Sequence, residues 1–376
     1  MFFPAACGTG RTMPVPLLML LSTSLLWSVN AHLTLNSDGS MGKNLISKSE
    51  WAAKLSKAVY YGEDYDPNLA GTLTSYTNDW WVKGDALVHW QYKTCFVAFQ
   101  GMDLLGASDG SVDGEIEKAA RMAMLVLDDV IQDTIDDIKD SGFTPIPREH
   151  TTADQCRFNT GLIQDWLDDH VNGDSGLFDT IETCMDLCAE KHSESSCKVI
   201  YTGHSQGGVE AMATAYYLED KWFHQSKPPA IITFGQPGTF NAASCPALAK
   251  WEDYMYRYIN LQKFNSDGVS FDIAPTIGGT HMGNTVLLSE DVYTVKFYDH
   301  SVDPYMGPYR GDSFSIFTDG DYSSVSAHSM SKYKARLLAK DHGGNSRVET
   351  TGFSRASACD IGEHCKSGSC PGNRCS

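Results

Sequence analysis

A serine framed by glycines, in the segment Gly203-His204-Ser205-Gln206-Gly207, is the part of this sequence best suited to covalent chemistry. A serine hydroxyl becomes a strong nucleophile only when a base takes its proton, a third group orients that base, and hydrogen-bond donors stabilise the oxyanion. An apolar, β-rich run, residues 199–202, precedes the serine, and an alanine-rich run, residues 209–218, follows it. This order predicts a strand, a sharp turn and a helix, with Ser205 exposed at the turn.

The residues around the serine fit such a turn. Side chains at positions 203 and 207 would collide in so sharp a bend, so Gly203 and Gly207 are needed there. The helix that begins after the serine directs a free amide and the positive end of its dipole toward the hydroxyl. We expect His204 to pack or to hydrogen-bond rather than to act as the base, because it points away from the serine on the same turn.

The elements that must position this serine follow from the apolar pattern. Residues 47–65 have helical spacing, with Ser49 as the expected cap, and residues 94–99 are apolar throughout, as in a strand covered on both faces. Residues 115–142 predict an amphipathic helix. Further short β-rich runs alternate with helical stretches, which favours an α/β fold with a mostly parallel central sheet and helices on both faces.

The N-terminal residues 1–31 predict a secretory signal peptide. Arg11 supplies the positive charge, residues 16–27 are mostly apolar, and small residues end at Ala31. An uncleaved anchor is the alternative interpretation. The chain has 376 residues and a formal net charge of −18. An acidic surface repels phosphate groups, which excludes nucleic acid as a partner but leaves a neutral oil surface open.

The cysteines indicate an oxidising compartment. The chain has 11, of which Cys7 leaves with the signal peptide, and the remaining even number predicts disulfides. We expect Cys95 to be a free buried thiol, and local bridges among Cys184, Cys188 and Cys197. After a catalytic domain of residues 32–340, residues 341–376 predict a linker and a cysteine-rich tail, in which two disulfides are favoured over zinc.

No cofactor or metal is expected. Residues 109–116 have the acidic pattern of the first half of a calcium loop, but the twelfth position would be Ala120, which has no ligand atom. A flexible acidic loop is therefore the favoured interpretation of this segment.

Segments on both sides of the serine resemble the fungal-type (class 3) triacylglycerol lipases. Besides VIYTGHSQGG with ITFGQP after it, the similar stretches are TCFVAFQGM, CRFNTGL, FDIAPTIGGTHMGNTVLL and VSAHSMSKYKARL. The resemblance covers roughly residues 47–338. It implies an α/β-hydrolase fold and a secreted serine esterase that hydrolyses carboxylic esters, above all acylglycerols, without a cofactor. Its partner would be an ester or lipid substrate, including one at an oil–water interface.

The resemblance also implies roles for individual residues. Ser205 would be the nucleophile, His328 the base and Asp272 the carboxylate that orients it, in the chain order of this fold. The backbone amides of Met102 and Gln206 would form the oxyanion hole. The family often has a hydroxyl at the position of Met102, which can offer only its amide.

Several alternatives remain open at this point. Asp267 is the rival carboxylate, and His300 is the main rival base. The other histidines after Asp272 are His281, which matches a family histidine other than the base, His342 and His364.

The substrate and the role of the chain also remain open. Gln100, Met102 and Gln206 stand where the family has Arg, Thr and Leu, so a catalytically silent lipase-like binding protein is a rival. A feruloyl-type or phospholipid esterase on the same fold, and an interaction protein that acts through its tail, are the others. Residues 102–114 lie where the family has its lid, with an ordinary loop as the alternative.

Overall fold

The computed structural model describes residues 43–60, 80–83, 85–102, 140–147, 156–222, 229–239, 245, 251, 254–264, 268–272, 274–276, 281–288, 294–298, 328–341 and 347–349. The expected signal peptide, the helix at 115–142, the lid segment and the acidic loop at 109–116 therefore lie outside the described residues, apart from their edges. So does most of the expected tail. None of the helices within the described part is both long and apolar enough to cross a membrane.

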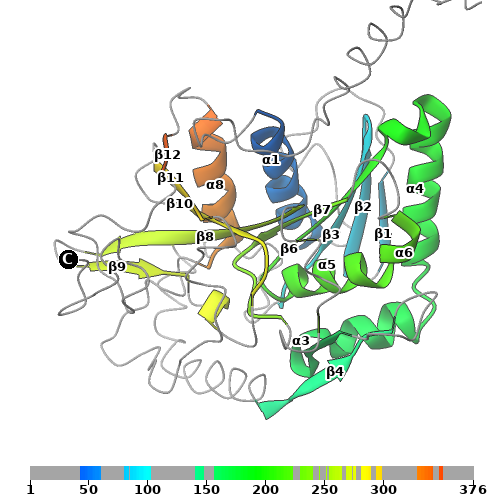
Figure 1. The fold of residues 1–376 in the computed structure, drawn as a ribbon, viewed down its shortest axis with the longest axis horizontal. Coiled ribbons are helices and arrows are strands. Elements are labelled where there is room, and N and C mark those ends of the chain that lie inside the picture. Colours follow the sequence, from blue (N-terminus) through cyan, green and yellow to red (C-terminus); the bar gives the residue numbers. More distant parts are fainter. Residues whose placement is uncertain are drawn as a thin grey trace, which may run out of the picture. The chain divides into compact units, whose positions relative to one another are not determined.

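A large sheet forms the centre of the fold (Figure 1). Its strands follow the order β1-β2-β3-β6-β7-β8-β10-β11-β12, and β9 pairs with β8. The run from β3 through β6, β7 and β8 to β10 is parallel, while β1, β2 and β3 are antiparallel. This confirms the α/β class and the mostly parallel sheet. The strands span Trp80–Lys83 (β1), Ala86–Gln91 (β2), Thr94–Phe99 (β3), Lys198–His204 (β6), Ala230–Phe234 (β7), Met255–Phe264 (β8), Gly268–Phe271 (β9), Asn284–Leu288 (β10), Thr294–Tyr298 (β11) and Arg347–Glu349 (β12).

Helices cover both faces of the sheet. On one face α1 (Lys43–Ala58) and α8 (Met330–Asp341) lie side by side. On the other lie α3 (Thr160–Trp166), which continues into a π-helical turn (Leu167–Val171), α4 (Leu177–Lys191), α5 (Gln206–Tyr217) and the short α6 (Glu219–Trp222). A two-stranded sheet, β4 (Phe143–Pro145) and β5 (Arg157–Asn159), precedes α3.

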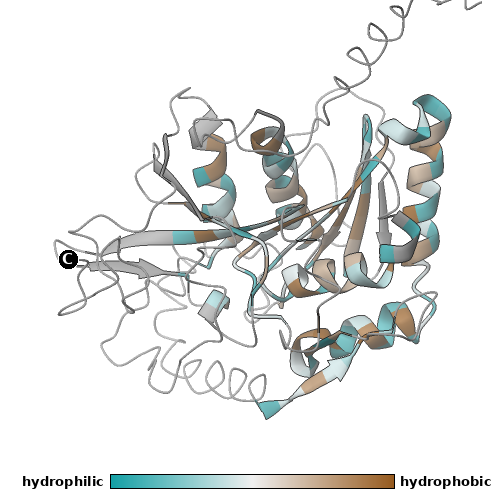
Figure 2. Cartoon of the chain, viewed as in Figure 1, coloured by the Kyte–Doolittle hydropathy of each residue, from teal (hydrophilic) through white to brown (hydrophobic). Residues whose placement is uncertain are grey.

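Two cores lie on the two faces of the sheet because side chains alternate along each strand. In β3, Cys95, Val97 and Phe99 pack toward α4 and α5, while Phe96 and Ala98 pack toward α1 and α8. Every residue of β3 is buried, as its apolar run predicts. Figure 2 shows the same division on the helices, where hydrophobic residues follow the inward sides and hydrophilic residues the outward sides.

The first helix departs from its expected boundaries. It begins at Lys43 and ends at Ala58, so Ser49 is not its cap but lies within it. Ser49 is buried, and its hydroxyl accepts a hydrogen bond from Tyr258 at 2.6 Å. The serine serves the contact between helix and sheet, which a local pattern could not reveal.

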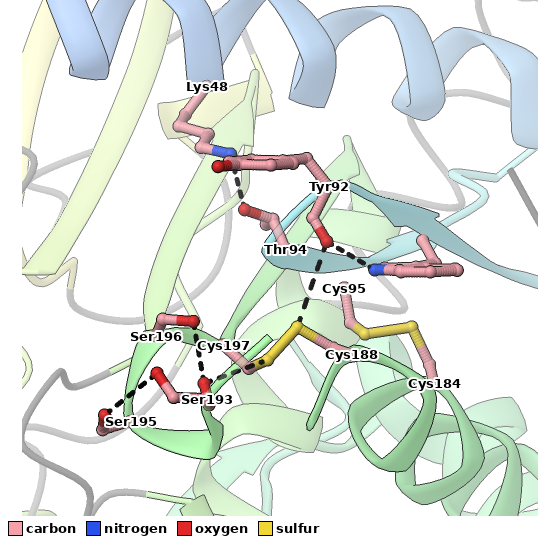
Figure 3. The surroundings of a disulfide bond; sticks show 11 residues. Lys48, Tyr92, Thr94, Cys95, Cys184, Cys188, Ser193, Ser195, Ser196 and Cys197 are labelled. Carbon is pink, nitrogen blue, oxygen red and sulfur yellow. Dashed lines mark hydrogen bonds between the residues drawn. A yellow bond between two sulfur atoms is a disulfide. The ribbon is translucent and has the colours of Figure 1, made fainter. Parts of the chain in front are cut away.

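The disulfides correct one expectation and confirm another. Cys95 is not a free thiol: it pairs with Cys184 and ties β3 to α4 (Figure 3). Cys188 pairs with Cys197 nearby, the local bridge that their spacing predicts. Cys156 pairs with a distant residue, Cys245. Residues 347–349, within the expected linker, form β12 and pair in parallel with β11.

Candidate active site

Ser205 lies on a strained turn between β6 and α5. Its backbone has φ 56° and ψ −129°, a left-handed conformation that costs a non-glycine residue about 1–3 kcal/mol. Its N–H donates to the carbonyl of Phe234 at 2.9 Å, and its own carbonyl accepts from Gly208 at 3.0 Å. The strand–turn–helix arrangement expected for residues 199–218 is therefore present, and the surrounding structure holds the strain.

The two flanking glycines make the turn possible. A Cβ on Gly203 would run into the backbone of Gly207, and a Cβ on Gly207 would run into the carbonyl oxygens of Phe99 and Gln100. These are backbone contacts, which cannot move aside as a flexible side chain could. Glycine is thus required at position 203 for the turn to close on itself, and at position 207 for the turn to pack against the end of β3.

Asp272 and His328 form a hydrogen-bonded pair. The Nδ1 atom of His328 lies 2.9 Å from each carboxylate oxygen of Asp272. The carboxylate is fully buried and also accepts the hydroxyl of Tyr333 at 2.5 Å and the N–H of Ala274 at 2.9 Å. Because the carboxylate only accepts, His328 carries its proton on Nδ1 and keeps Nε2 free to take one.

The donors around Asp272 stabilise its charge. Burial on its own would raise the pKa of this carboxyl, but His328, the Tyr333 hydroxyl and the Ala274 amide outweigh that effect, and the pKa lies below its usual value. Asp272 is therefore a carboxylate at neutral pH. Burial raises the pKa of Tyr333 well above its usual value, and the charge of Asp272 raises it further. The tyrosine therefore keeps its proton and remains a hydrogen-bond donor.

The pair lies beside the end of β7, next to the serine turn. A Cβ on Gly235 would come within 2.5 Å of Asp272 Oδ2 and 2.9 Å of His328 Nδ1. Gly235 has φ 58°, and the preceding residue, Phe234, accepts the N–H of Ser205. The Asp272–His328 pair thus lies beside the turn that carries Ser205, although these residues are far apart in the chain.

His204 links three parts of the site. Its Nε2 lies 2.6 Å from the carbonyl oxygen of His328, which can only accept, so Nε2 carries the proton. Its Nδ1 then accepts the hydroxyl of Tyr60 at 2.8 Å, and Tyr60 in turn accepts the N–H of Gly101 at 3.1 Å. Burial, followed by the charge of His328, lowers the pKa of His204 to about 3. A neutral imidazole with both nitrogens engaged holds its neighbours in place and is unsuited to be the base.

The two expected oxyanion donors border the serine. Gln206 is the first residue of α5, directly after Ser205. Gly101, just before Met102, comes so close to the serine that a Cβ there would lie 2.9 Å from the Ser205 Cβ. Met102 itself packs against the core on the α5 side of the sheet.

The rival residues separate into two groups. Asp267, His300, His342 and His364 lie outside the described residues. His281 is buried, and its Nε2 lies 2.5 Å from the carbonyl oxygen of Pro275. Burial and the nearby charge of Arg257 hold the pKa of His281 well below its usual value, so this histidine remains neutral.

Some residues of the site had no signal in the sequence. Tyr60 lies at the end of the first helical segment, where nothing indicates a contact with His204. Glu210 was missed as well: it is buried on the first turns of α5, and burial, followed by the charge of Asp85, raises its pKa well above the usual value. The one available sign was a glutamate in an otherwise apolar, alanine-rich helix, GGVEAMATAYY.

Residues 130–264 match the family described as lipase (class 3). Similar solved structures include the triacylglyceride lipase of Rhizomucor miehei, with 17% identity over 66% of this chain and 81% of that one and a TM-score of 0.39. The Lip2 lipase of Yarrowia lipolytica has 16% identity over 66% and 80% of the two chains, with a TM-score of 0.39. No curated protein matches the chain.

The matched segment contains the serine turn and the strands on either side of it, β6, β7 and β8. This segment of the chain is therefore similar to the class 3 lipases, and the mostly parallel sheet with helices on both faces agrees with an α/β-hydrolase fold.

Proposed function

We propose that the protein is a secreted serine esterase that hydrolyses acylglycerols through Ser205, His328 and Asp272. The observation that carries the proposal is the hydrogen-bonded pair of the buried Asp272 and the partly exposed His328, beside the strained serine turn. Asp272 and His328 lie outside the segment that matches the family, so their roles rest on this geometry and on the resemblance of their motifs.

The chemistry follows from the protonation states. His328 Nε2 takes the hydroxyl proton of Ser205 as the serine oxygen bonds to the ester carbonyl carbon, and Asp272 stabilises the imidazolium. The amides of Met102 and Gln206 donate to the oxyanion of the tetrahedral intermediate. His328 then gives its proton to the departing alcohol, which leaves an acyl-enzyme. Water, deprotonated by His328, releases the acid and restores Ser205.

Secretion is supported by the N-terminal pattern and by the three disulfides of the described residues, which are typical of an oxidising compartment. Sequencing the N-terminus of the protein recovered from culture medium tests this part. The expected first residue is His32, and a chain that stays in the membrane fraction with its first 31 residues would contradict secretion.

The catalytic proposal is tested with a fluorophosphonate probe and a panel of esters. The wild type should be labelled and should hydrolyse esters, while Ser205→Ala should do neither. Ser175→Ala is the matched control, because Ser175 also belongs to a serine–histidine–aspartate chain. Its hydroxyl lies 2.7 Å from His170 Nδ1, and His170 Nε2 lies 2.7 Å from Asp85 Oδ1. Ser175 Oγ, however, accepts the N–H of Leu177 at the start of α4, as a helix-start residue does. Labelling that survives Ser205→Ala and disappears with Ser175→Ala would overturn the proposal.

The same panel separates the rivals. Preference for acylglycerols over aryl esters and phospholipids supports the proposal, whereas a preference for feruloyl esters or phospholipids would identify another esterase of this fold. A wild type that neither reacts with the probe nor hydrolyses any ester would be a silent binding protein.

The role of the tail requires a truncation that respects the fold. Because α8 extends to Asp341 and β12 to Glu349, the tail should be removed after residue 349. Unchanged ester hydrolysis in this variant would show that the cysteine-rich tail is accessory to the chemistry.

A further inference from the structure

A chain of three hydrogen bonds connects two segments of the candidate site. The N–H of Gly101 donates to the hydroxyl of Tyr60 at 3.1 Å, and this hydroxyl lies 2.8 Å from Nδ1 of His204. Nε2 of His204 lies 2.6 Å from the backbone carbonyl oxygen of His328. Tyr60 and His204 are both buried. The chain thus joins the segment that ends at Met102 to the segment that carries the proposed base.

The protons of this chain have one arrangement. The carbonyl oxygen of His328 can only accept, so His204 carries its proton on Nε2 and offers Nδ1 as an acceptor. The Tyr60 hydroxyl therefore donates to Nδ1 while its oxygen accepts the N–H of Gly101. Every group donates in the same direction, and hydrogen bonds aligned in this way strengthen one another. The single hydroxyl of Tyr60 is used twice, once for each segment.

The Tyr60 hydroxyl also lies close to the point where Gly101 approaches the serine. A Cβ on Gly101 would lie 2.5 Å from the Tyr60 hydroxyl oxygen and 2.9 Å from the Ser205 Cβ. Because the Gly101 N–H is bonded to Tyr60, the donor that this segment offers to an oxyanion is the next amide, that of Met102. The position of the tyrosine hydroxyl therefore influences where the Met102 amide lies relative to the serine.

At the other end of the chain, His204 contacts the proposed base through its ring as well. The centroids of the His204 and His328 rings are 4.5 Å apart, with an angle of 33° between the planes. His328 would become an imidazolium during hydrolysis, and a second positive charge at this distance would oppose that step. Burial lowers the pKa of His204 to about 3, so its ring is neutral. The hydrogen bond that Tyr60 donates to Nδ1 fits this neutral form.

We propose that Tyr60 is a positioning residue for ester hydrolysis, whose hydroxyl fixes the Gly101–Met102 segment and, through His204, the segment of His328. An oxyanion donor and a base act together only if both keep their distance to the serine, and a displacement of about 1 Å can cost about 100-fold in rate. The inference rests on the proposed function, because it uses the roles assigned there to Met102 and His328.

The first test is Tyr60→Phe, which keeps the ring but removes the hydroxyl. It should lower kcat about 10- to 100-fold and leave KM within about threefold. Tyr216→Phe is the matched control, since it removes another buried tyrosine hydroxyl that accepts a backbone N–H, that of Cys156 at 2.9 Å. This control should keep kcat within about twofold. The value of kcat is expressed per serine titrated to completion with a fluorophosphonate, so that unfolded protein does not enter it.

Two variants of His204 test the rest of the chain. His204→Gln supplies one oxygen to accept from Tyr60 and one NH₂ group to donate to the His328 carbonyl, so it should keep kcat within about fivefold of the wild type. His204→Leu supplies neither and should lose about as much as Tyr60→Phe. Because both losses come from one chain, the double variant should lose little more than the worse of the two single variants.

A transition-state analogue separates positioning from general damage. An alkyl trifluoromethyl ketone adds to a catalytic serine and places a negatively charged oxygen in the oxyanion hole. Its inhibition constant should rise in Tyr60→Phe by about the same factor as kcat falls, and should not rise in Tyr216→Phe.

The outcomes are distinct for the two levels of the argument. Ester hydrolysis that persists in Ser205→Ala would refute the proposed function itself. If Ser205→Ala is inactive but Tyr60→Phe keeps both kcat and inhibitor affinity, only the positioning role is refuted, even if the melting temperature falls. If Tyr60→Phe does not fold, His204→Gln decides, and a loss of more than about tenfold in kcat would contradict the role of the hydrogen bonds.

Discussion

Replacing Asp272 by asparagine is the sharpest test of the candidate triad. Three donors converge on the Asp272 carboxylate: Nδ1–H of His328, the Tyr333 hydroxyl and the Ala274 amide. An asparagine side chain has one acceptor oxygen and one NH₂ group, so in Asp272→Asn a donor must face a donor. The imidazole can relieve this conflict by moving its proton to Nε2, but His328 then cannot accept the proton of Ser205.

The expected loss is therefore large. A triad histidine held in the wrong tautomer loses about 10,000-fold in kcat, or about 5.4 kcal/mol of transition-state stabilisation. The assay is the steady-state hydrolysis of a p-nitrophenyl ester, with circular dichroism to confirm that the variant folds. Asp267→Asn, which alters the rival carboxylate, is the matched control and should retain kcat within about twofold. Our reasoning is refuted if Asp272→Asn keeps kcat within about tenfold of the wild type, or if Asp267→Asn is the variant that fails.

Three further substitutions follow from the structure. Tyr333→Phe removes a donor to Asp272 and an acceptor for the N–H of Asn260; it should lower kcat about tenfold and the unfolding free energy by about 2–4 kcal/mol. Because the depressed pKa of Asp272 stabilises the fold above about pH 4 and this stability is lost as pH falls, the variant should also begin acid unfolding at a higher pH. Tyr258→Phe, which loses another buried tyrosine hydroxyl, should lower stability alone, and an equal loss of kcat in both would contradict a specific role. Gly207→Ala should destabilise the protein by about 2–5 kcal/mol and abolish probe labelling. Gly142→Ala is its control: Gly142 has φ 72° but open space where a Cβ would lie, so this substitution should cost only about 1 kcal/mol. Similar melting temperatures for the two variants would count against the packing argument. Glu210→Gln should reduce the fall in melting temperature between pH 4.5 and pH 8, because Glu210 keeps its proton in the folded state but loses it in the unfolded state above about pH 4.3; an unchanged fall would mean that Glu210 is ionised when folded.

The sequence predicted those parts of the fold that depend on short-range pattern. The apolar run of β3 and the strand–turn–helix around Ser205 are visible in the sequence because burial on both faces and a tight turn each restrict the residue types that fit. The pairing of Cys95 with Cys184 was not predictable, because it depends on α4 packing over β3, and the chain between them gives no measure of that distance. Ser49 is a similar case, since its partner, Tyr258, lies on a strand in the second half of the chain.

The candidate site divides in the same way. The proposed triad residues were found through their motifs, whereas Tyr60 and Glu210 were missed because their surroundings arise from contacts between distant segments. Only the folded chain shows that the Tyr60 hydroxyl reaches both His204 and the Gly101 amide. Polar residues that support a site from behind have no characteristic spacing, so they are the ones that sequence analysis tends to overlook.

The order in which the chain supplies the site has a consequence for how the protein matures. Tyr60 precedes the first strand of the sheet, whereas His328 and Tyr333 come after β11. A chain still emerging from the ribosome thus has its serine turn long before His328, its proposed base, and Tyr333 must arrive before Asp272 has its full set of donors. Hydrolysis by the proposed triad should therefore begin only after α8, which follows His328 in the chain, has docked beside α1.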